Sequence, residues 1–420
     1  MQLGSASPVS SSPSLPTFLP LRHSPLCHRP PPPKFAAAYL LLFPCACCGD
    51  VEALKKLCAD LYMDRWSGIL RVPLHPNSRT HHRVGASLCL SPGTRTLTVP
   101  SANAIFFCGD RVEGTGNPVI ERLSNLQKLS EILVSKFGSF INTWVIEASV
   151  YNGPFAVFKD FIPSVNQYGE PRSYHPIGFP ASTSAVSLLL NCLEEVKKVI
   201  SGRQIEAHTG STPSSRFSHP KTFILGFSKG GTVLNQLVTE LGFTDIGSNV
   251  NSPHVEQAID RKFSTREEMD IVPKTKESLL NSITEIHYVD VGLNSSGAYL
   301  TDPDVFERIS KRLIQGAPQV GFVLHGTPRQ WSDKRRYWIR DEKDKMLHLL
   351  ESEAHKNGGK LQVHERYYFA DKSPDMQMHF EVIESLDFKA PGMTKGGIRL
   401  EDDPMDDEVE ENPIEWPAEN

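Results

Sequence analysis

Short apolar runs alternate with amphipathic segments along most of this chain. Apolar or β-branched runs predict strands over residues 104–108, 142–148, 222–227, 283–289, 319–324 and 361–369, and short β-rich pieces with turns between them over residues 69–73 and 87–99. Apolar positions at helical spacing predict helices over residues 119–137, 182–200, 231–241, 304–314, 341–355 and 379–386. Strands separated by helices indicate an α/β protein with a mostly parallel sheet and helices on both faces.

Several segments fall outside this pattern. Residues 201–220 and 242–281 are polar and predict a loop and a surface insertion within one domain of residues 63–391. Residues 1–62 have the character of a leader, since the first 49 contain no Asp or Glu and many Ser and Pro. They fit a transit peptide, or translation starts at Met63. The apolar run of residues 35–48 is too short for a membrane helix, so no transmembrane span is expected.

Charge and cysteine usage narrow the classes of function. The net charge is −5, and residues 400–420 hold ten acidic and no basic residues, which leaves +5 on the rest of the chain. We expect residues 392–420 to form an acidic disordered tail, and no basic block suggests nucleic-acid binding. The eight cysteines all lie at or before Cys192, and the cluster of residues 45–48 lacks a partner pair with zinc spacing. We therefore predict free thiols and no metal.

The motif with a chemical mechanism is Gly-x-Ser-x-Gly, formed by Gly226, Ser228 and Gly230. A serine hydroxyl is a poor nucleophile and must be presented to a base. A sharp strand-to-helix turn presents it, and the glycines let strand and helix approach closely. A strand is predicted before Ser228 and a helix after it, which indicates the nucleophile turn of an α/β-hydrolase fold. A glycine-rich turn that binds phosphate at a helix N-terminus is the alternative.

Such a serine needs an acid and a histidine later in the chain, in that order. His379 lies after the last predicted strand, where this histidine is expected, whereas the other late histidines lie within a strand or helix. Two aspartates are candidates for the acid. Asp333 follows the strand of residues 319–324, and Asp290 ends the strand of residues 283–289. We favour Asp333, although it also fits a helix N-cap.

Backbone N–H groups should bind the oxyanion in such a site. One is expected from Lys229, directly after the serine, and the other from Gly109 or Asp110, where an apolar run ends. The Lys229 side chain is expected to be solvated, or to attract an anionic substrate. An aromatic-rich stretch between Phe155 and Phe179 forms either a cap over the site or ordinary packing on the core.

These motifs resemble a eukaryotic family named after human chromosome two open reading frame sixty-nine. The resemblance covers about residues 100–388 and rests on the segments 106–110, 225–230, 233–237, 288–290, 327–330 with Asp333, and 378–380. It implies a plant-type member with a hydrolase-like fold and, as in the animal members, a mitochondrial location. The chain departs from the family pattern at Cys108, where proline is usual, and at Val291, where glycine is usual.

The first functional hypothesis is a serine hydrolase that cleaves a small ester or thioester. Ser228 would attack the carbonyl, His379 would take its proton, and Asp333 or Asp290 would orient the imidazole, with no cofactor required. The second is a catalytically silent hydrolase-fold scaffold that binds a protein partner. The third is a lipase whose aromatic cap meets a lipid surface. Plastid and, with a start at Met63, cytoplasmic locations are alternatives to the mitochondrion.

Overall fold

The computed structural model describes residues 63–112, 114–201, 220–245 and 271–388. The expected leader, the acidic tail, and most of the polar stretches of residues 201–220 and 242–281 lie outside these ranges. Among the described residues, eight strands form one sheet in the order β1-β2-β4-β3-β7-β8-β9-β10. β2 runs antiparallel to both neighbours, and every other pair is parallel.

The strands of this sheet are β1 (Asp64–Pro73), β2 (His81–Leu90), β3 (Ala102–Cys108), β4 (Ile141–Glu147), β7 (Lys221–Phe227), β8 (Ile283–Val289), β9 (Val320–Gly326) and β10 (Leu361–Tyr367). A separate hairpin consists of β5 (Val150–Asn152) and β6 (Phe155–Val157). The helices are α2 (Pro118–Leu123), α3 (Leu126–Phe137), α4 (Pro180–Ser201), α5 (Gly231–Phe243), α6 (Lys276–Ser282), α7 (Pro303–Ile314), α8 (Pro328–Trp331), α9 (Tyr337–Lys356) and α10 (Met376–Ser385). Two single 3-10 turns are η1 (Ser228–Gly230) and η2 (Lys334–Arg336).

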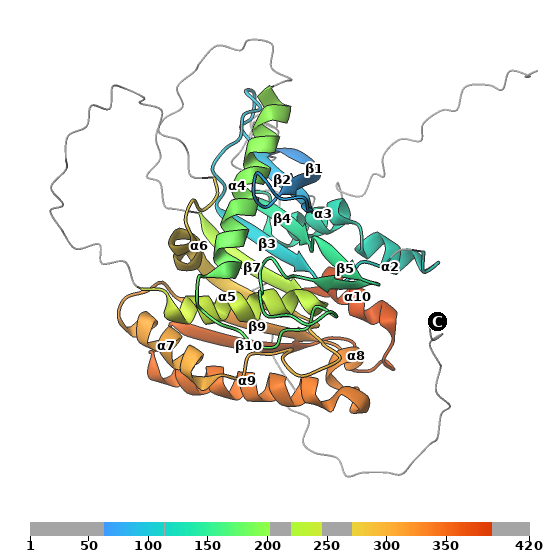
Figure 1. The fold of residues 1–420 in the computed structure, drawn as a ribbon, viewed down its shortest axis with the longest axis vertical. Coiled ribbons are helices and arrows are strands. Elements are labelled where there is room, and N and C mark those ends of the chain that lie inside the picture. The colour runs from blue at the N-terminus through green and yellow to red at the C-terminus, as the bar shows by residue number, and fades with distance from the viewer. Residues whose placement is uncertain (1–62, 113, 202–219, 246–270, 389–420) are drawn as a thin grey trace, which may run out of the picture. The chain divides into compact units, whose positions relative to one another are not determined.

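The sheet has a hydrophobic core on each face, because successive strand residues point to opposite sides. Along β3, Ile105 and Phe107 join a core with α4, α5, α6, α7 and α9, whereas Ala104 and Phe106 join a second core with α2, α3 and α10. Figure 1 shows these helices around the sheet. This strand order, with only β2 reversed in the sheet and helices on both faces, is that of an α/β-hydrolase fold. The predicted fold class is therefore confirmed.

Some predicted elements have different bounds in the structure. The helix expected over residues 119–137 is divided, because α2 ends at Leu123 and the Asn125 side chain accepts from Lys128 N at 3.0 Å to begin α3. Of the β-rich pieces expected over residues 87–99, the structure has the end of β2 and a single bridge at Leu97, with turn between them. The end of the expected surface insertion belongs to the core, since α6 buries Leu279 and Leu280. A polar average over 40 residues concealed this short apolar segment.

Candidate active site

Ser228 stands at the sharp turn between β7 and α5. Its backbone φ is 51°, a left-handed value that a non-glycine residue adopts only where the surroundings enforce it. The flanking glycines explain why the turn is possible. A Cβ on Gly226 would lie 2.6 Å from the carbonyl oxygen of Gly230, and a Cβ on Gly230 would collide with the carbonyl oxygen of Phe107. The motif therefore forms the strand-to-helix turn that its sequence predicted.

His379 lies on α10 and is almost fully buried beside this turn. Asp375 begins the helix by accepting a hydrogen bond from Met378 N at 2.6 Å. The imidazole of His379 packs against the ring of Phe227, the residue before Ser228, with ring centroids 4.5 Å apart. Helix α10 thus brings a histidine to the carboxyl end of β7, far from it in sequence.

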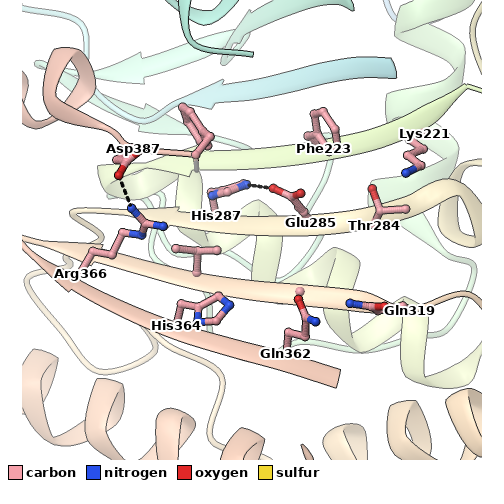
Figure 2. Close-up of a pocket in the computed structure, with 13 residues that line it drawn as sticks. Lys221, Phe223, Thr284, Glu285, His287, Gln319, Gln362, His364, Arg366 and Asp387 are labelled. Carbon is pink, nitrogen blue, oxygen red and sulfur yellow. Dashed lines mark hydrogen bonds and ion pairs between the residues drawn. The ribbon is translucent and has the colours of Figure 1, made fainter. Parts of the chain in front are cut away.

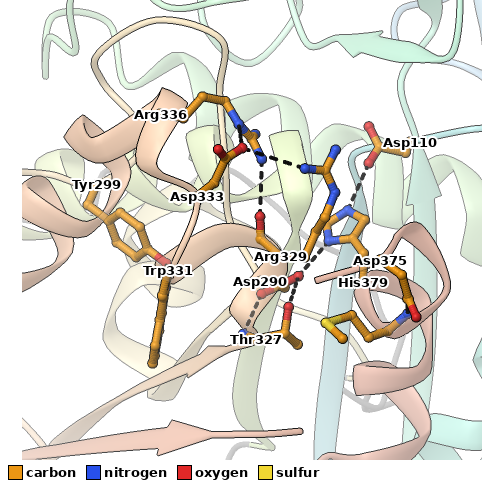
Figure 3. A network of polar contacts seen from close by, with 11 residues as sticks. Asp110, Asp290, Tyr299, Thr327, Arg329, Trp331, Asp333, Arg336, Asp375 and His379 are labelled. Carbon is orange, nitrogen blue, oxygen red and sulfur yellow. Dashed lines mark hydrogen bonds and ion pairs between the residues drawn. The ribbon is translucent and has the colours of Figure 1, made fainter. Parts of the chain in front are cut away.

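The acid that reaches His379 is Asp290. Its Oδ2 lies 2.6 Å from Nδ1 of His379, and the side chain is fully buried at the end of β8 (Figure 3). Thr327, directly after β9, donates to the same carboxylate from its N–H at 2.7 Å and its hydroxyl at 3.0 Å. Asp290 has a φ of 43°, a second left-handed backbone at this edge of the sheet. The sequence did not indicate Thr327 as a partner of the acid.

The preference for Asp333 as the acid is wrong in this structure. Asp333 accepts from the backbone N–H of Arg335 at 3.0 Å at the start of η2, and Nε of Arg336 donates to it at 3.0 Å (Figure 3). Burial raises the pKa of Asp333, but these hydrogen bonds and the nearby arginines outweigh it and lower the pKa overall. Its carboxylate caps the start of η2, which is the alternative role that the sequence analysis gave for it. It also pairs with arginine side chains.

A second carboxylate contacts the other side of the imidazole. Oδ2 of Asp110 lies 3.2 Å from Nε2 of His379, so the ring stands between Asp290 and Asp110 (Figure 3). Desolvation lowers the pKa of His379, but the two carboxylates outweigh it and raise this pKa to about 9. Among the described residues, no hydrogen bond joins Ser228 to His379. The two carboxylates therefore favour the protonated form of the imidazole.

The two candidate oxyanion donors lie next to each other. A Cβ on Gly109 would collide with the backbone nitrogen of Lys229. Only glycine therefore allows the turn after β3 to approach the strand-to-helix turn at Gly226–Gly230, hereafter the elbow, this closely. Gly109 O accepts from Ala156 N at 3.0 Å, and Arg111 N donates to Pro154 O at 2.9 Å. These bonds fasten the turn, on both sides of Asp110, to β6 and to the residue before it. The N–H of Lys229, in the first turn of a helix, is among those that lack an intrahelical acceptor.

The Lys229 side chain is buried, contrary to the expectation of a solvated one. Its Nζ donates to the carbonyl oxygen of Tyr168 at 2.6 Å and lies 4.6 Å from the ring centroid of Phe155. Desolvation lowers the pKa of this ammonium group, and Glu170 and Asp110 oppose that shift. The lysine thus fastens the aromatic stretch to the elbow.

The aromatic stretch of residues 155–179 packs partly on the core, and the cap role remains a prediction. Phe158 and Phe161 are buried and pack edge-to-face on Phe107, with centroids 6.1 and 5.4 Å away. Phe155 and Tyr168, by contrast, are exposed beside Lys229. Only the second pair can meet a ligand without a rearrangement of the core.

A cavity of about 320 Å³ lies elsewhere on the sheet, over β7 to β10 (Figure 2). Its lining includes Lys221, His364 and the buried His287, which contacts Glu285 at 3.0 Å and His325 at 3.1 Å. Neither Ser228 nor His379 lines it. Within the described ranges, no group of three His, Cys, Asp or Glu side chains is arranged to hold a metal ion.

Comparisons with solved structures find serine hydrolases and related enzymes at low similarity. The chain is 10% identical to an S-formylglutathione hydrolase from Agrobacterium tumefaciens, with a TM-score of 0.32 over 76% of this chain and 92% of that one. It is 11% identical to acyl-protein thioesterase 2 from Zea mays, with a TM-score of 0.30 over 72% and 96% of the two chains. The fold assignment therefore rests on the strand order described above.

Sequence comparisons are more specific. A family model described as C2orf69 matches residues 202–355, a segment that includes Ser228 and Asp290. The chain is 24% identical to the mitochondrial protein C2orf69 homolog of Mus musculus, over 62% of this chain and 69% of that one. It is 24% identical to the homolog of Danio rerio, over 76% and 86% of the two chains. No described helix is long and apolar enough to cross a bilayer. The family model and these relatives together support membership of the C2orf69 family.

Proposed function

We propose that this protein is a serine hydrolase that cleaves an ester or thioester. The observation that supports this most directly is the 2.6 Å contact between buried Asp290 and Nδ1 of His379, next to a serine with left-handed backbone. A carboxylate on Nδ1 fixes the imidazole tautomer that exposes Nε2 to a nucleophile. Ser228, Asp290 and His379 follow one another in the chain order of the hydrolase triad, which is serine, acid, histidine.

The proposed reaction uses only side chains and backbone of this chain. Ser228 Oγ attacks the carbonyl carbon while its proton moves to Nε2 of His379, and Asp290 stabilises the imidazolium. The N–H groups of Lys229 and of Gly109 or Asp110 stabilise the oxyanion. His379 then protonates the leaving group, and water releases the acyl group by the same route. No metal or organic cofactor takes part in these steps.

Covalent labelling with a fluorophosphonate probe tests this proposal. The full chain is labelled between pH 6 and 10, and the adduct is located by mass spectrometry. We expect modification of Ser228, and its loss in Ser228→Ala and His379→Ala. The control variants are Ser332→Ala, an exposed serine, and His364→Ala on β10, and both should label as the wild type does. A folded wild type that labels at no pH would favour the silent scaffold.

The lipase hypothesis has weaker support. It needs an exposed apolar cap, but of the three phenylalanines at the start of the aromatic stretch only Phe155 is exposed. Substitution of Phe158 or Phe161 would disturb the core rather than a lipid-binding surface. We therefore place the substrate among small esters or thioesters. Binding of the wild type to liposomes that is lost in a folded Phe155→Ser variant would support the lipase hypothesis.

We also propose a mitochondrial location, because the curated relatives are named mitochondrial proteins. The acid-free, Ser- and Pro-rich residues 1–49 would carry the signal. Fusion of residues 1–62 to a fluorescent reporter checks this in cells. A diffuse cytosolic signal would contradict it, and a plastid signal would favour the alternative organelle.

A further inference from the structure

The side chain of Asp110 has a position that the proposed reaction does not explain. This residue follows β3, and only 8% of its surface is exposed. Oδ2 contacts Nε2 of His379 at 3.2 Å, while Oδ1 is buried and lacks a hydrogen-bond partner among the described residues. A buried carboxylate oxygen without a donor is costly, so the contact with His379 is the principal compensation for burying this charge.

The backbone holds this carboxylate in place. Residues on both sides of Asp110 hydrogen-bond to the hairpin strand β6 and its preceding residue, and Sγ of Cys108 lies 3.3 Å from the Asp110 carbonyl oxygen. Gly109 is wedged against the elbow backbone. These contacts hold the backbone of the turn in place, so rotation of the Asp110 side chain is the simplest way to remove the carboxylate from the imidazole.

This contact conflicts with the chemistry proposed for Ser228. An imidazole has two nitrogens, and Nδ1 is already bonded to Asp290. The serine proton must therefore go to Nε2, which requires that Nε2 carry no proton at that moment. While Nε2 carries a proton and donates it to Asp110, it cannot accept the proton of Ser228.

We propose that Asp110 is a positioning residue that competes with Ser228 for Nε2 of His379 and holds the site in a resting form. The inference rests on the proposed function. In the resting form the imidazole carries a proton on each nitrogen. Before attack, the Nε2 proton leaves to solvent and the Asp110 side chain turns away. The Ser228 proton then takes its place as the bond between Oγ and the carbonyl carbon forms.

The charged groups around the ring agree with this assignment. Asp290 and Asp110 are the two carboxylates that face the imidazole, and together they raise the pKa of His379 to about 9. The positive charge of Lys229 acts on Asp110 from the elbow side, and that of Arg329 acts on Asp290. At pH 7 only about one ring in a hundred is then unprotonated. The serine should react slowly at neutral pH and faster as the pH approaches 9.

The test compares Asp110→Asn with wild type in the full chain, using the rate constant of fluorophosphonate labelling from pH 6 to 10. In the wild type we expect about a tenfold rise per pH unit up to about 9. In Asp110→Asn the rise should occur at lower pH, and labelling at pH 7 should be at least about tenfold faster.

A matched control is available in the same domain. Asp160 contacts Nε2 of buried His82 at 3.2 Å, a carboxylate–imidazole pair outside the site. Asp160→Asn should leave the labelling rate and its pH profile unchanged. Asp110→Ala is the second variant, in case Asp110→Asn does not fold. If folded Asp110→Asn and Asp110→Ala both keep the wild-type profile or label more slowly, Asp110 does not compete with Ser228.

A second measurement separates this inference from the proposed function. The His379 imidazole pKa is measured by NMR in Ser228→Ala, with and without Asp110→Asn, and the resonance is assigned with His379→Gln. We expect Asp110→Asn to lower this pKa by at least one unit. If the pKa does not change while wild type labels, the inference fails and the hydrolase proposal stands. If the pKa falls but no variant labels at any pH, the hydrolase proposal fails, and the competition fails with it.

Discussion

Asp290, at the end of β8, and Asp333, at the start of η2, have different roles because of their immediate neighbours. Asp290 is fully buried and faces an imidazole and the two donors of Thr327. Asp333 is paired with Arg329 at 3.6 Å and Arg336 at 3.0 Å. A carboxylate that faces a histidine can orient it, whereas one that is neutralised by arginines fastens a loop.

Asp290→Asn should lower the labelling rate of Ser228 by roughly 10³–10⁴, because an amide at Nδ1 no longer fixes the productive tautomer. Asp333→Asn should label within about twofold of wild type. It should still lower the free energy of unfolding by roughly 1–3 kcal/mol, through loss of charge-assisted hydrogen bonds at the η2 cap. Labelling kinetics and urea denaturation measure the two effects. Loss of labelling in a folded Asp333→Asn variant would reverse the assignment of the acid.

At the scale of elements, the long helix α4 is fixed to its neighbour by a buried carboxylate. Glu240 on α5 accepts from the backbone N–H groups of Ala181 and Ser182, each at 2.8 Å, and from the Ser182 hydroxyl at 2.6 Å. These N–H groups lie in the first turn of α4, where they lack intrahelical acceptors. Burial raises the pKa of Glu240, although these hydrogen bonds oppose the shift. The contact aligns α4 with the helix that follows Ser228.

Glu240→Ala should lower the free energy of unfolding by roughly 3–5 kcal/mol, since it removes the acceptor of the Ala181 and Ser182 N–H groups and of the Gln236 amide. The control is Glu194→Ala on α4, whose carboxylate is exposed and pairs with Lys197. That change should cost less than about 1 kcal/mol. Chemical denaturation of the two variants gives the comparison. Equal losses would mean that the buried contact does not stabilise the packing of α4 on α5.

At the scale of the whole molecule, the site joins parts of the chain that the sheet brings together. Asp110 follows β3, Ser228 follows β7, Asp290 follows β8, and His379 comes after β10. The carboxyl ends of these parallel strands share one edge of the sheet, with α10 placed beside them (Figure 1). Ionisation of the site is therefore coupled to the stability of the fold.

The free energy of unfolding should fall as the pH rises from about 6.5 to about 9. The pKa of His379 is about 9 in the folded protein, above its ordinary value of 6.5. A raised pKa stabilises the fold fully below 6.5, and this contribution is lost as the pH passes through 9. The expected loss is on the order of 3 kcal/mol. Urea denaturation at several pH values should show it in wild type and His364→Gln. If the free energy of unfolding of His379→Gln fell by the same amount over this pH range, the pH dependence would not come from His379.

The sequence by itself determined the features that depend on local sterics and periodicity. Alternating apolar runs and helical spacing gave the order of strands and helices, and the glycines around Ser228 predicted a turn that only residues without a Cβ permit. The position of His379 after the last strand could also be predicted, because it depends only on the order of elements along the chain. These are properties of short segments, so one sequence is enough to predict them.

Only the tertiary structure decided which side chains meet. Asp290 and Asp333 both follow strands, and the choice depended on Thr327 and the arginines that the folded chain places around them. The contact of Asp110 with His379 joins residues 269 positions apart. The burial of Lys229 depends on a loop that folds back over the elbow. Such contacts depend on distance and desolvation in three dimensions, and the local pattern of residues carries neither.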